Sequence, residues 1–236
     1  MAKTCAFSIL LKLLPFLTTT ALYFGFVTKD PEGELWTTVL KCLPIFGLML
    51  FIGMHKMNSI LDCYGGKILL GLTFSVTGDA LLNLDLFPHG MGAFAVAQIC
   101  YIAAYGLKPV KFYFAIPFYA LGIAMYVVVF EKLDVVLKVG LPIYAFLLTS
   151  MVWRSVVQAS TKPNFFNILC AFGSFMFAVS DGFIAIDKFY TPIPHARYYI
   201  MTTYYFAQCA ITLSIVNRIG ETVGEKKINK KKSKKN

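Results

Sequence analysis

Long apolar runs, separated at short intervals by charged residues, glycine or proline, make up most of the chain. Each run is close to the ~20 residues that an α-helix needs to cross a bilayer. The pattern predicts eight transmembrane helices, at Phe7–Val27, Leu35–Met54, Ile68–Phe87, Met91–Leu107, Phe112–Phe130, Val135–Trp153, Phe165–Ile186 and Arg197–Val216. We therefore expect an all-α, polytopic membrane protein.

The composition agrees with this pattern. Of the 236 residues, 58% are hydrophobic and 14% are charged, whereas soluble domains are about 45–50% apolar and about 25% charged. Eight crossings with short connections use almost the whole length, so no separate soluble domain is expected. We predict one transmembrane domain over residues 1–218 and a basic tail over residues 219–236.

Positive charge is distributed unevenly over the predicted connections. It recurs in alternate connections, at Lys56, Lys67, Lys108, Lys111, Arg154, Lys162 and Arg218. The positive-inside rule then predicts that both termini face the cytosol, which requires an even number of crossings.

The net charge of +10 belongs largely to the tail, because seven lysines fall within residues 226–236. A nucleic-acid-binding surface would need basic residues spread over a folded body, so no nucleic-acid partner is expected. Lys232 and Lys234, the fifth and third residues from the end, resemble dilysine signals that return membrane proteins to the endoplasmic reticulum. The alternative is a generic basic tail attracted to anionic lipid.

The two halves of the chain repeat weakly. Matching positions recur in the same order, namely Pro44 with Pro142, Asp79 with Asp181, Asp85 with Asp187, Phe87 with Phe189, and Gln98 with Gln208. Such repeats are common in multi-helix membrane proteins. The pattern predicts two four-helix halves related by an axis along the membrane normal.

Two carboxylates fall within predicted membrane helices, Asp79 and Asp181. Each costs about 2.5–3.5 kcal/mol at a helix centre, so such a residue usually marks a functional polar cavity. Other polar residues on neighbouring helices are candidates to line this cavity or bind substrate: Lys41, Asn83, Gln98, Tyr101, Arg197, Tyr204 and Gln208. The alternative is that these groups only hydrogen-bond one helix to another.

Metal and cofactor sites are not expected. The six cysteines form no C-x-x-C pair, and His89 and His195 lie in loops where solvation is the simpler interpretation. The chain also has no G-x-S-x-G or H-E-x-x-H motif, so it offers no case for a serine hydrolase or a zinc protease.

Several segments together resemble the lysoplasmalogenase family of eight-helix membrane proteins, which has the bacterial YhhN proteins as distant relatives. They are residues 41–46 (KCLPIF), 71–80 (GLTFSVTGDA), Ser180-Asp181, Lys188-Phe189, residues 192–194, residues 200–205 (IMTTYY) and Ala207-Gln208. The resemblance implies hydrolysis of the vinyl-ether bond of lysoplasmalogens, which yields a fatty aldehyde and glycerophosphoethanolamine or glycerophosphocholine.

The two aspartates suggest a mechanism for that reaction. Protonation of the vinyl ether gives an oxocarbenium ion, as in glycoside hydrolysis, where two carboxyl groups divide the work. We hypothesise that either Asp79 or Asp181 is a protonated acid and that the other is ionised; the sequence leaves their order open. Polar side chains would orient water or the glycerol hydroxyl, with Lys41 and Arg197 as candidate partners of the phosphate. The candidates for orientation are Asn83, Gln98, Tyr204 and Gln208.

Two other functions fit parts of the pattern. Paired intramembrane carboxylates also serve as proton relays, so a proton-coupled transporter of a small or lipid-like solute is the main alternative. The equivalent prolines Pro44 and Pro142 fit that alternative, since transporters often have broken helices in matching positions. A non-catalytic lipid-binding scaffold is the third. The sequence leaves the oligomeric state and the preferred head group open.

Overall fold

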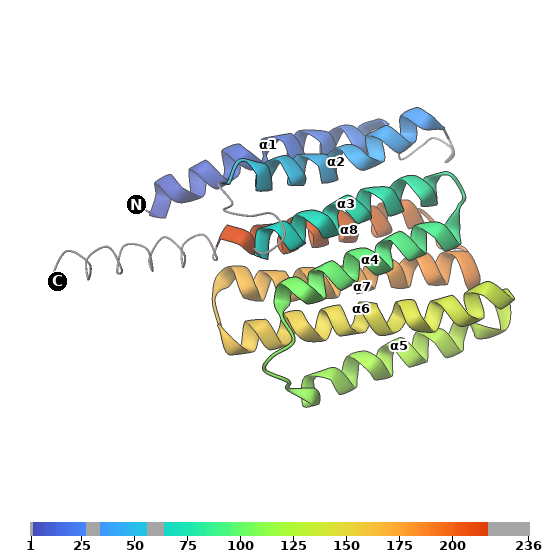
Figure 1. The fold of residues 1–236 in the computed structure, drawn as a ribbon. Coiled ribbons are helices and arrows are strands. Elements are labelled where there is room, and N and C mark those ends of the chain that lie inside the picture. Colours follow the sequence, from blue (N-terminus) through green and yellow to red (C-terminus); the bar gives the residue numbers. More distant parts are fainter. Residues whose placement is uncertain (1, 27–33, 56–63, 217–236) are drawn as a thin grey trace.

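Eight α-helices are present in the computed structural model, which describes residues 2–26, 34–55 and 64–216 (Figure 1). They are α1 (Ala2–Phe26), α2 (Leu35–Gly53), α3 (Tyr64–Asn83), α4 (Phe87–Tyr105), α5 (Ala115–Val129), α6 (Val135–Thr161), α7 (Phe165–Phe189) and α8 (Ala196–Leu213). Short 3-10 turns flank α5, at Phe112–Phe114 and Phe130–Lys132. The predicted all-α architecture is confirmed.

Six of these helices are long and apolar enough to cross a membrane, and α3 and α8 are the two that are less apolar. At 20 and 18 residues, α3 and α8 extend about 30 and 27 Å, which matches a hydrocarbon core of about 30 Å. The protein is an integral, multi-pass membrane protein, and the lengths of α3 and α8 are compatible with two further crossings.

The helices lie side by side in one bundle. In Figure 1, α1 and α2 form one edge, α5 forms the opposite edge, and α3 and α8 lie between them. The most extensive contacts join α3 to α4 and α7 to α8. We call the end of the bundle that holds the α3–α4, α5–α6 and α7–α8 connections the Asp85 end. The first residues of α1 and the last residues of α8 lie at the opposite end of the bundle.

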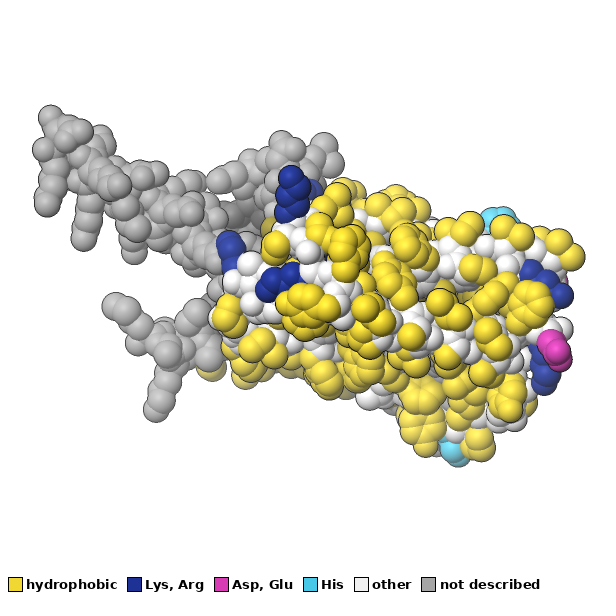
Figure 2. Space-filling model, turned by 90° about the horizontal axis from the view of Figure 1, so that it is seen from below, with side chains coloured by type: hydrophobic (Ala, Val, Ile, Leu, Met, Phe, Trp, Pro, Cys, Tyr) yellow, Lys and Arg dark blue, Asp and Glu magenta, His cyan; other side chains and the backbone are white. Residues whose placement is uncertain are grey.

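The sides of the bundle are apolar and its ends are charged. Seen from the α5 side, hydrophobic side chains cover the middle of the molecule, with Lys and Arg toward both ends and acidic side chains at one end (Figure 2). On α5, the side chains of Ile116, Ile123 and Val127 are all strongly exposed. Such a belt is stable in hydrocarbon, because helices satisfy their own backbone hydrogen bonds.

The α3–α4 turn lies earlier than the apolar pattern predicts. The pattern carries the third helix on to Phe87 and starts the fourth at Met91, but α3 ends at Asn83 and α4 begins at Phe87. Pro88 lies in the first turn of α4, where its missing N–H costs nothing. Asp85 has a φ of 58°, a left-handed conformation that reverses the chain within three residues.

Helix α6 is longer than predicted, running to Thr161 instead of Trp153. The prediction placed Arg154 in a charged connection, but the structure buries it inside α6. Its guanidinium donates to the carbonyl oxygens of Gly106 and Pro109, at 2.7 and 2.8 Å. A charge that looks like a helix boundary in the sequence is therefore satisfied by the end of a neighbouring helix and the loop that follows it.

The predicted basic tail over residues 219–236, with its dilysine motif, lies outside the described residues. Lys56 and Arg218 lie outside them as well. The division into a transmembrane domain and a tail, and the cytosolic placement of the termini, therefore stay predictions.

Small residues allow α7 and α8 to pack closely. A Cβ atom on Gly173 would lie 2.5 Å from the Ala210 side chain and 3.0 Å from the Ala207 carbonyl oxygen. Close backbone approach of this kind is a main source of helix association in membranes. Elsewhere on α7, a Cβ atom on Gly182 would meet no atom within 4 Å.

We expect Gly173→Ala to destabilise the protein and Gly182→Ala to leave its stability unchanged or slightly raised. The first change forces α8 away, at a typical overpacking cost of about 1–3 kcal/mol; the second gains helix propensity of up to about 1 kcal/mol. Thermal unfolding of the detergent-purified variants measures both. Equal melting temperatures for the two variants would contradict this packing.

Candidate functional site

Asp79 is the most buried carboxylate among the described residues, with 2% of its surface exposed. The Lys41 ammonium lies 3.9 Å from its Oδ1 atom, and the Tyr204 hydroxyl donates a 2.5 Å hydrogen bond to Oδ2. Both partners are buried. A carboxylate away from water is tolerated only with such partners, so α2, α3 and α8 are brought together around it.

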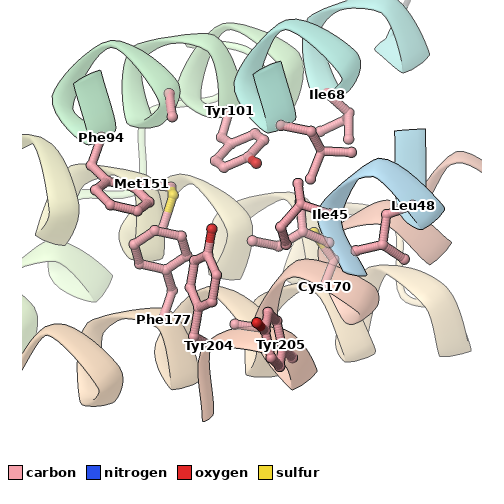
Figure 3. Packing of buried hydrophobic residues seen from close by; sticks show 14 of the residues in the cluster. Ile45, Leu48, Ile68, Phe94, Tyr101, Met151, Cys170, Phe177, Tyr204 and Tyr205 are labelled. Atoms are coloured by element: carbon pink, nitrogen blue, oxygen red, sulfur yellow. The ribbon is translucent and has the colours of Figure 1, made fainter. Parts of the chain in front are cut away.

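Aromatic rings hold Tyr204 in place. Its ring meets those of Phe94 and Phe177 edge-on, with centroids 5.9 and 5.7 Å apart. Figure 3 shows Tyr204 reaching into the core beside Phe177, with Phe94 on the facing helix. Edge-to-face packing stabilises such rings, so the hydroxyl that binds Asp79 has little freedom to move.

A buried hydrogen-bonded group lies next to this pair. The Tyr101 hydroxyl donates to Gln208 Oε1 at 2.8 Å, and Gln208 Nε2 donates to Ser75 Oγ at 2.9 Å. All three side chains are fully buried. Both ends of the Gln208 amide are thus occupied, and they link α3, α4 and α8.

Asp181 lies in a different environment. It is only partly buried, and its Oδ2 atom accepts a 2.5 Å hydrogen bond from the Tyr144 hydroxyl. Among the described residues, no cation lies within ion-pair distance of it. The charges of Asp79 and Asp181 are close enough to interact, but each carboxylate has its own tyrosine.

Gln98 is fully buried on α4, yet neither atom of its amide has a hydrogen-bond partner among the described residues. The side chain lies near the Tyr144 hydroxyl. An unsatisfied buried amide costs free energy and is therefore an unusual feature that needs an explanation.

Gln98 differs in its surroundings from the Gln208 amide on α8, its counterpart in the predicted repeat. That amide is held by Ser75 and Tyr101. In the register of the repeat, the equivalent positions around Gln98 are Phe177 and Ile211, which cannot form hydrogen bonds. Gln208 is therefore held by two hydrogen bonds, whereas the Gln98 amide has no such partners among the described residues.

Two further candidates have other surroundings. Asn83 donates to the hydroxyls of Thr37 and Thr38 at 3.1 and 2.7 Å, so it faces α2 and not the aspartates. Arg197 lies at the Asp85 end, where it lines a cavity together with Lys41. The structure thus groups Lys41, Tyr204 and Asp79, and separates Asn83 from them.

Two cavities reach Asp181, and a third cavity adjoins one of them. An apolar groove of about 270 Å³ lies between α5, α6 and α7 and reaches both Asp181 and Tyr144. A polar cavity of about 350 Å³ lies at the Asp85 end. A narrow space of about 40 Å³ shares residues with both, including Asp181 and Ile184. Asp181 therefore lies between the apolar groove and a narrow space that leads toward the polar cavity.

The sequence interpretation missed Tyr144. It lies in an apolar stretch of α6. No other polar residue lies three or four positions away, so the sequence shows no polar helix face there. Only the folded structure shows that its hydroxyl is the partner of Asp181.

Comparison with known proteins agrees with this architecture. The model of the YhhN family matches residues 36–215. The chain belongs to the YhhN family. The matched segment of this YhhN protein contains every candidate site residue, from Lys41 to Gln208.

Curated relatives of the YhhN protein are named lysoplasmalogenases. The lysoplasmalogenase TMEM86A of Homo sapiens is 32% identical over 212 residues, which are 87% of this chain and 88% of the relative. The lysoplasmalogenase TMEM86B of Sus scrofa is 31% identical over 207 residues, which are 86% of this chain and 85% of the relative. No solved structure matches the chain. The family resemblance expected from the motifs is confirmed.

In the YhhN protein, Lys41→Met should destabilise the fold by about 3–5 kcal/mol, because it leaves the Asp79 carboxylate buried without its cation. The double change Lys41→Met with Asp79→Asn should recover most of that loss. Thermal unfolding in detergent reports both. Lys138→Met is a suitable control, since the Lys138 ammonium lies over the Phe130 ring and not beside a carboxylate. Additive losses in the double variant would mean that the pair is not coupled.

Proposed function

We propose that this protein is a lysoplasmalogenase, which hydrolyses the vinyl-ether bond of a lysoplasmalogen to a fatty aldehyde and glycerophosphoethanolamine or glycerophosphocholine. The names of its relatives support this activity. The observation that carries the proposal is the position of Asp181 between an apolar groove and a polar cavity. An amphipathic lipid with its reactive bond between chain and head group matches that division.

The groove suits the alkenyl chain. Its walls are almost entirely apolar, and Leu121, a residue of α5 with half of its surface exposed, forms part of its rim. A lipid can therefore enter sideways from the bilayer. The phosphate would lie in the polar cavity, within reach of Lys41 and Arg197, and the vinyl ether would lie beside Asp181.

The reaction needs one proton and one water. A carboxylic acid gives its proton to the outer alkene carbon, which turns the neighbouring carbon and the ether oxygen into an oxocarbenium ion. Water adds to that carbon and loses a proton. The resulting hemiacetal collapses to the aldehyde and the free glycerol hydroxyl, so that the proton used in the first step is returned.

The surroundings of the aspartates suggest how they divide the work. Asp181 lines the groove, and among the described residues its one hydrogen-bond partner is the neutral Tyr144 hydroxyl, so we assign it the role of proton donor. Asp79 lies beside Lys41, whose positive charge favours the ionised form. Its negative charge would then stabilise the oxocarbenium ion, as the second carboxylate does in glycosidases.

Gln98 is the best candidate to hold the attacking water. Its amide is buried and close to Tyr144, and in the described part of the chain no group lies within hydrogen-bond geometry of it, so a water bound there would satisfy a group that is otherwise costly. Tyr101 and Gln208 would act as positioning residues, because their polar atoms are already occupied by one another. Asn83 would support α2 and α3.

The distribution of positive charge along the chain supports a proposal for the cellular site of this reaction. Both termini would face the cytosol under the positive-inside rule. The tail would then present its lysines at residues 232 and 234 to the cytosolic retrieval machinery, which supports residence in the endoplasmic reticulum.

Aspartate variants test the mechanism. The native protein in detergent should release aldehyde from a lysoplasmalogen, and Asp181→Asn should lower kcat roughly 100-fold or more, in the range typical of general acids. Asp79→Asn should also lower it. In D₂O, the native product should carry one deuterium on the carbon next to the aldehyde group, measured by mass spectrometry after immediate reduction.

The thermal stability of each variant serves as the control for folding. An inactive native protein would refute the proposed activity. An active Asp181→Asn variant, or an aldehyde without deuterium, would refute the acid assigned here.

Gln98→Leu should lower kcat about 10-fold or more and leave thermal stability unchanged or higher, because the unpaired amide contributes no hydrogen bond. Gln208→Leu should instead lower the melting temperature, since it breaks two buried hydrogen bonds. Activity and thermal unfolding of the two variants are measured together. If Gln98→Leu unfolds the protein as readily as its counterpart, the amide has a structural role.

A further inference from the structure

The apolar groove that reaches Asp181 has a definite inner end. Its lining residues on α7 run from Ile186 to Phe175, over which a helix rises about 16 Å. On α5 and α6 the lining stops at Leu121 and Thr149, at the end that points away from the polar cavity. The groove therefore covers only about half of a hydrocarbon core of about 30 Å.

Contacts between α5 and α6 close this inner end. A Cβ atom on Gly122 would lie 3.0 Å from the Thr149 methyl carbon, so the two helices touch there. Just beyond this contact, the hydroxyls of Tyr119 and Ser150 share a 2.7 Å hydrogen bond. A hydrocarbon chain in the groove therefore cannot continue between α5 and α6 past this point.

The remaining exit leads sideways into lipid. Leu121 forms part of the rim, and half of its surface is exposed on the flank of the bundle. Lipid tails are as apolar as leucine side chains, so the carbon atoms of a ligand that leave the groove pass into an equivalent medium. Such carbon atoms contribute almost nothing to recognition. Only the carbon atoms inside the groove can be selected by their shape.

Gly182 is the residue that leaves space beside the carboxylate. It follows Asp181 on α7 and lines the groove, and a Cβ atom on it would meet no atom within 4 Å. Its φ is not in the left-handed region, so neither close packing nor backbone conformation requires glycine here. Glycine in a helix interior is destabilising compared with alanine. The room that glycine leaves for a ligand in the groove accounts for this position.

We propose that the groove recognises only the first carbon atoms of the hydrocarbon chain, and that Gly182 determines this specificity by leaving room for them beside Asp181. This inference rests on the proposed function, which places the reacting bond at Asp181. From Asp181 to Phe175, α7 rises about 9 Å. An extended chain of tetrahedral atoms advances about 1.2 Å per bond, so about seven carbon atoms fill that distance. The rest of the chain lies in the bilayer.

Two lysolipids that carry a saturated alkyl ether in place of the vinyl ether test how much of the chain is recognised. They share an ethanolamine head group and have chains of 10 or 18 carbons, and calorimetry gives each Kd as a mole fraction of detergent. The native protein should bind the two lipids within about 5-fold of each other, because their distal carbons move between equivalent media. A larger difference would show that the groove holds more of the chain and would overturn the proposal.

Gly182→Leu should weaken binding of both lipids at least about 10-fold and by the same factor, because its side chain fills the space that the first carbons need. Gly182→Ala, which changes the fold least, should give a smaller loss in the same direction. Gly92→Leu is the matched control and should keep the native Kd values. A Cβ atom on Gly92 also meets no atom within 4 Å, but Gly92 does not line the groove. Thermal unfolding checks that each variant is folded.

The outcomes separate this proposal from the proposed function, because neither lipid can be cleaved. Native Kd values in both Gly182 variants, or no binding by the native protein, would overturn the role of Gly182 even in a protein that hydrolyses lysoplasmalogens. The expected binding pattern in a protein without hydrolase activity would support the groove as a chain-binding site and refute only the proposed reaction.

Discussion

The burial of the Asp79 carboxylate beside the Lys41 ammonium is the constraint on which the rest of the bundle depends. In a medium without water, this carboxylate must find its partners within the protein. It does so on α2 and α8, and Tyr205 strengthens the arrangement by donating a 2.8 Å hydrogen bond to the backbone carbonyl of Lys41. The two helices that are least apolar, α3 and α8, accordingly lie between the outer pairs, where neighbouring helices shield their polar faces from lipid.

The predicted repeat relates positions whose surroundings differ in the structure. Asp79 has a nearby cation, whereas Asp181 has none among the described residues and lines the groove. Phe94 occupies the position equivalent to Tyr204, but its ring has no hydroxyl group. The hydrogen bond to Asp181 therefore comes from Tyr144, on another helix. Asp79 is thus buried with a cation and a hydroxyl as partners, whereas Asp181 lines a groove, and this difference fits the separate roles that we propose for them.

The sequence predicts the helical architecture and the two carboxylates within the membrane helices. The physical reasons for this success also explain which contacts the sequence does not predict. Twenty-residue apolar runs leave helices as the only possibility in lipid, and the cost of a carboxylate in hydrocarbon is enough to single out Asp79 and Asp181. Side-chain direction was less accessible. Asn83 shares a helix face with Asp79 but turns to threonines on α2, and Tyr144 has no polar neighbours along the chain. Which hydroxyl meets which carboxylate depends on the packing of distant helices, and periodicity within one helix does not encode it.

Asp181 lines the apolar groove and the narrow space that leads toward the polar cavity, and the groove and the polar cavity border different solvents. The apolar groove reaches the lipid-facing flank through Leu121, and the polar cavity reaches the aqueous boundary through the exposed Asp85. For a lipid cut at the junction, the two fragments have opposite solubilities and need not leave by the same route. The aldehyde can partition into the bilayer while the glycerophospho fragment diffuses into water. A geometry that admits an amphiphile thereby separates its products, and each departure makes recombination at the junction less frequent.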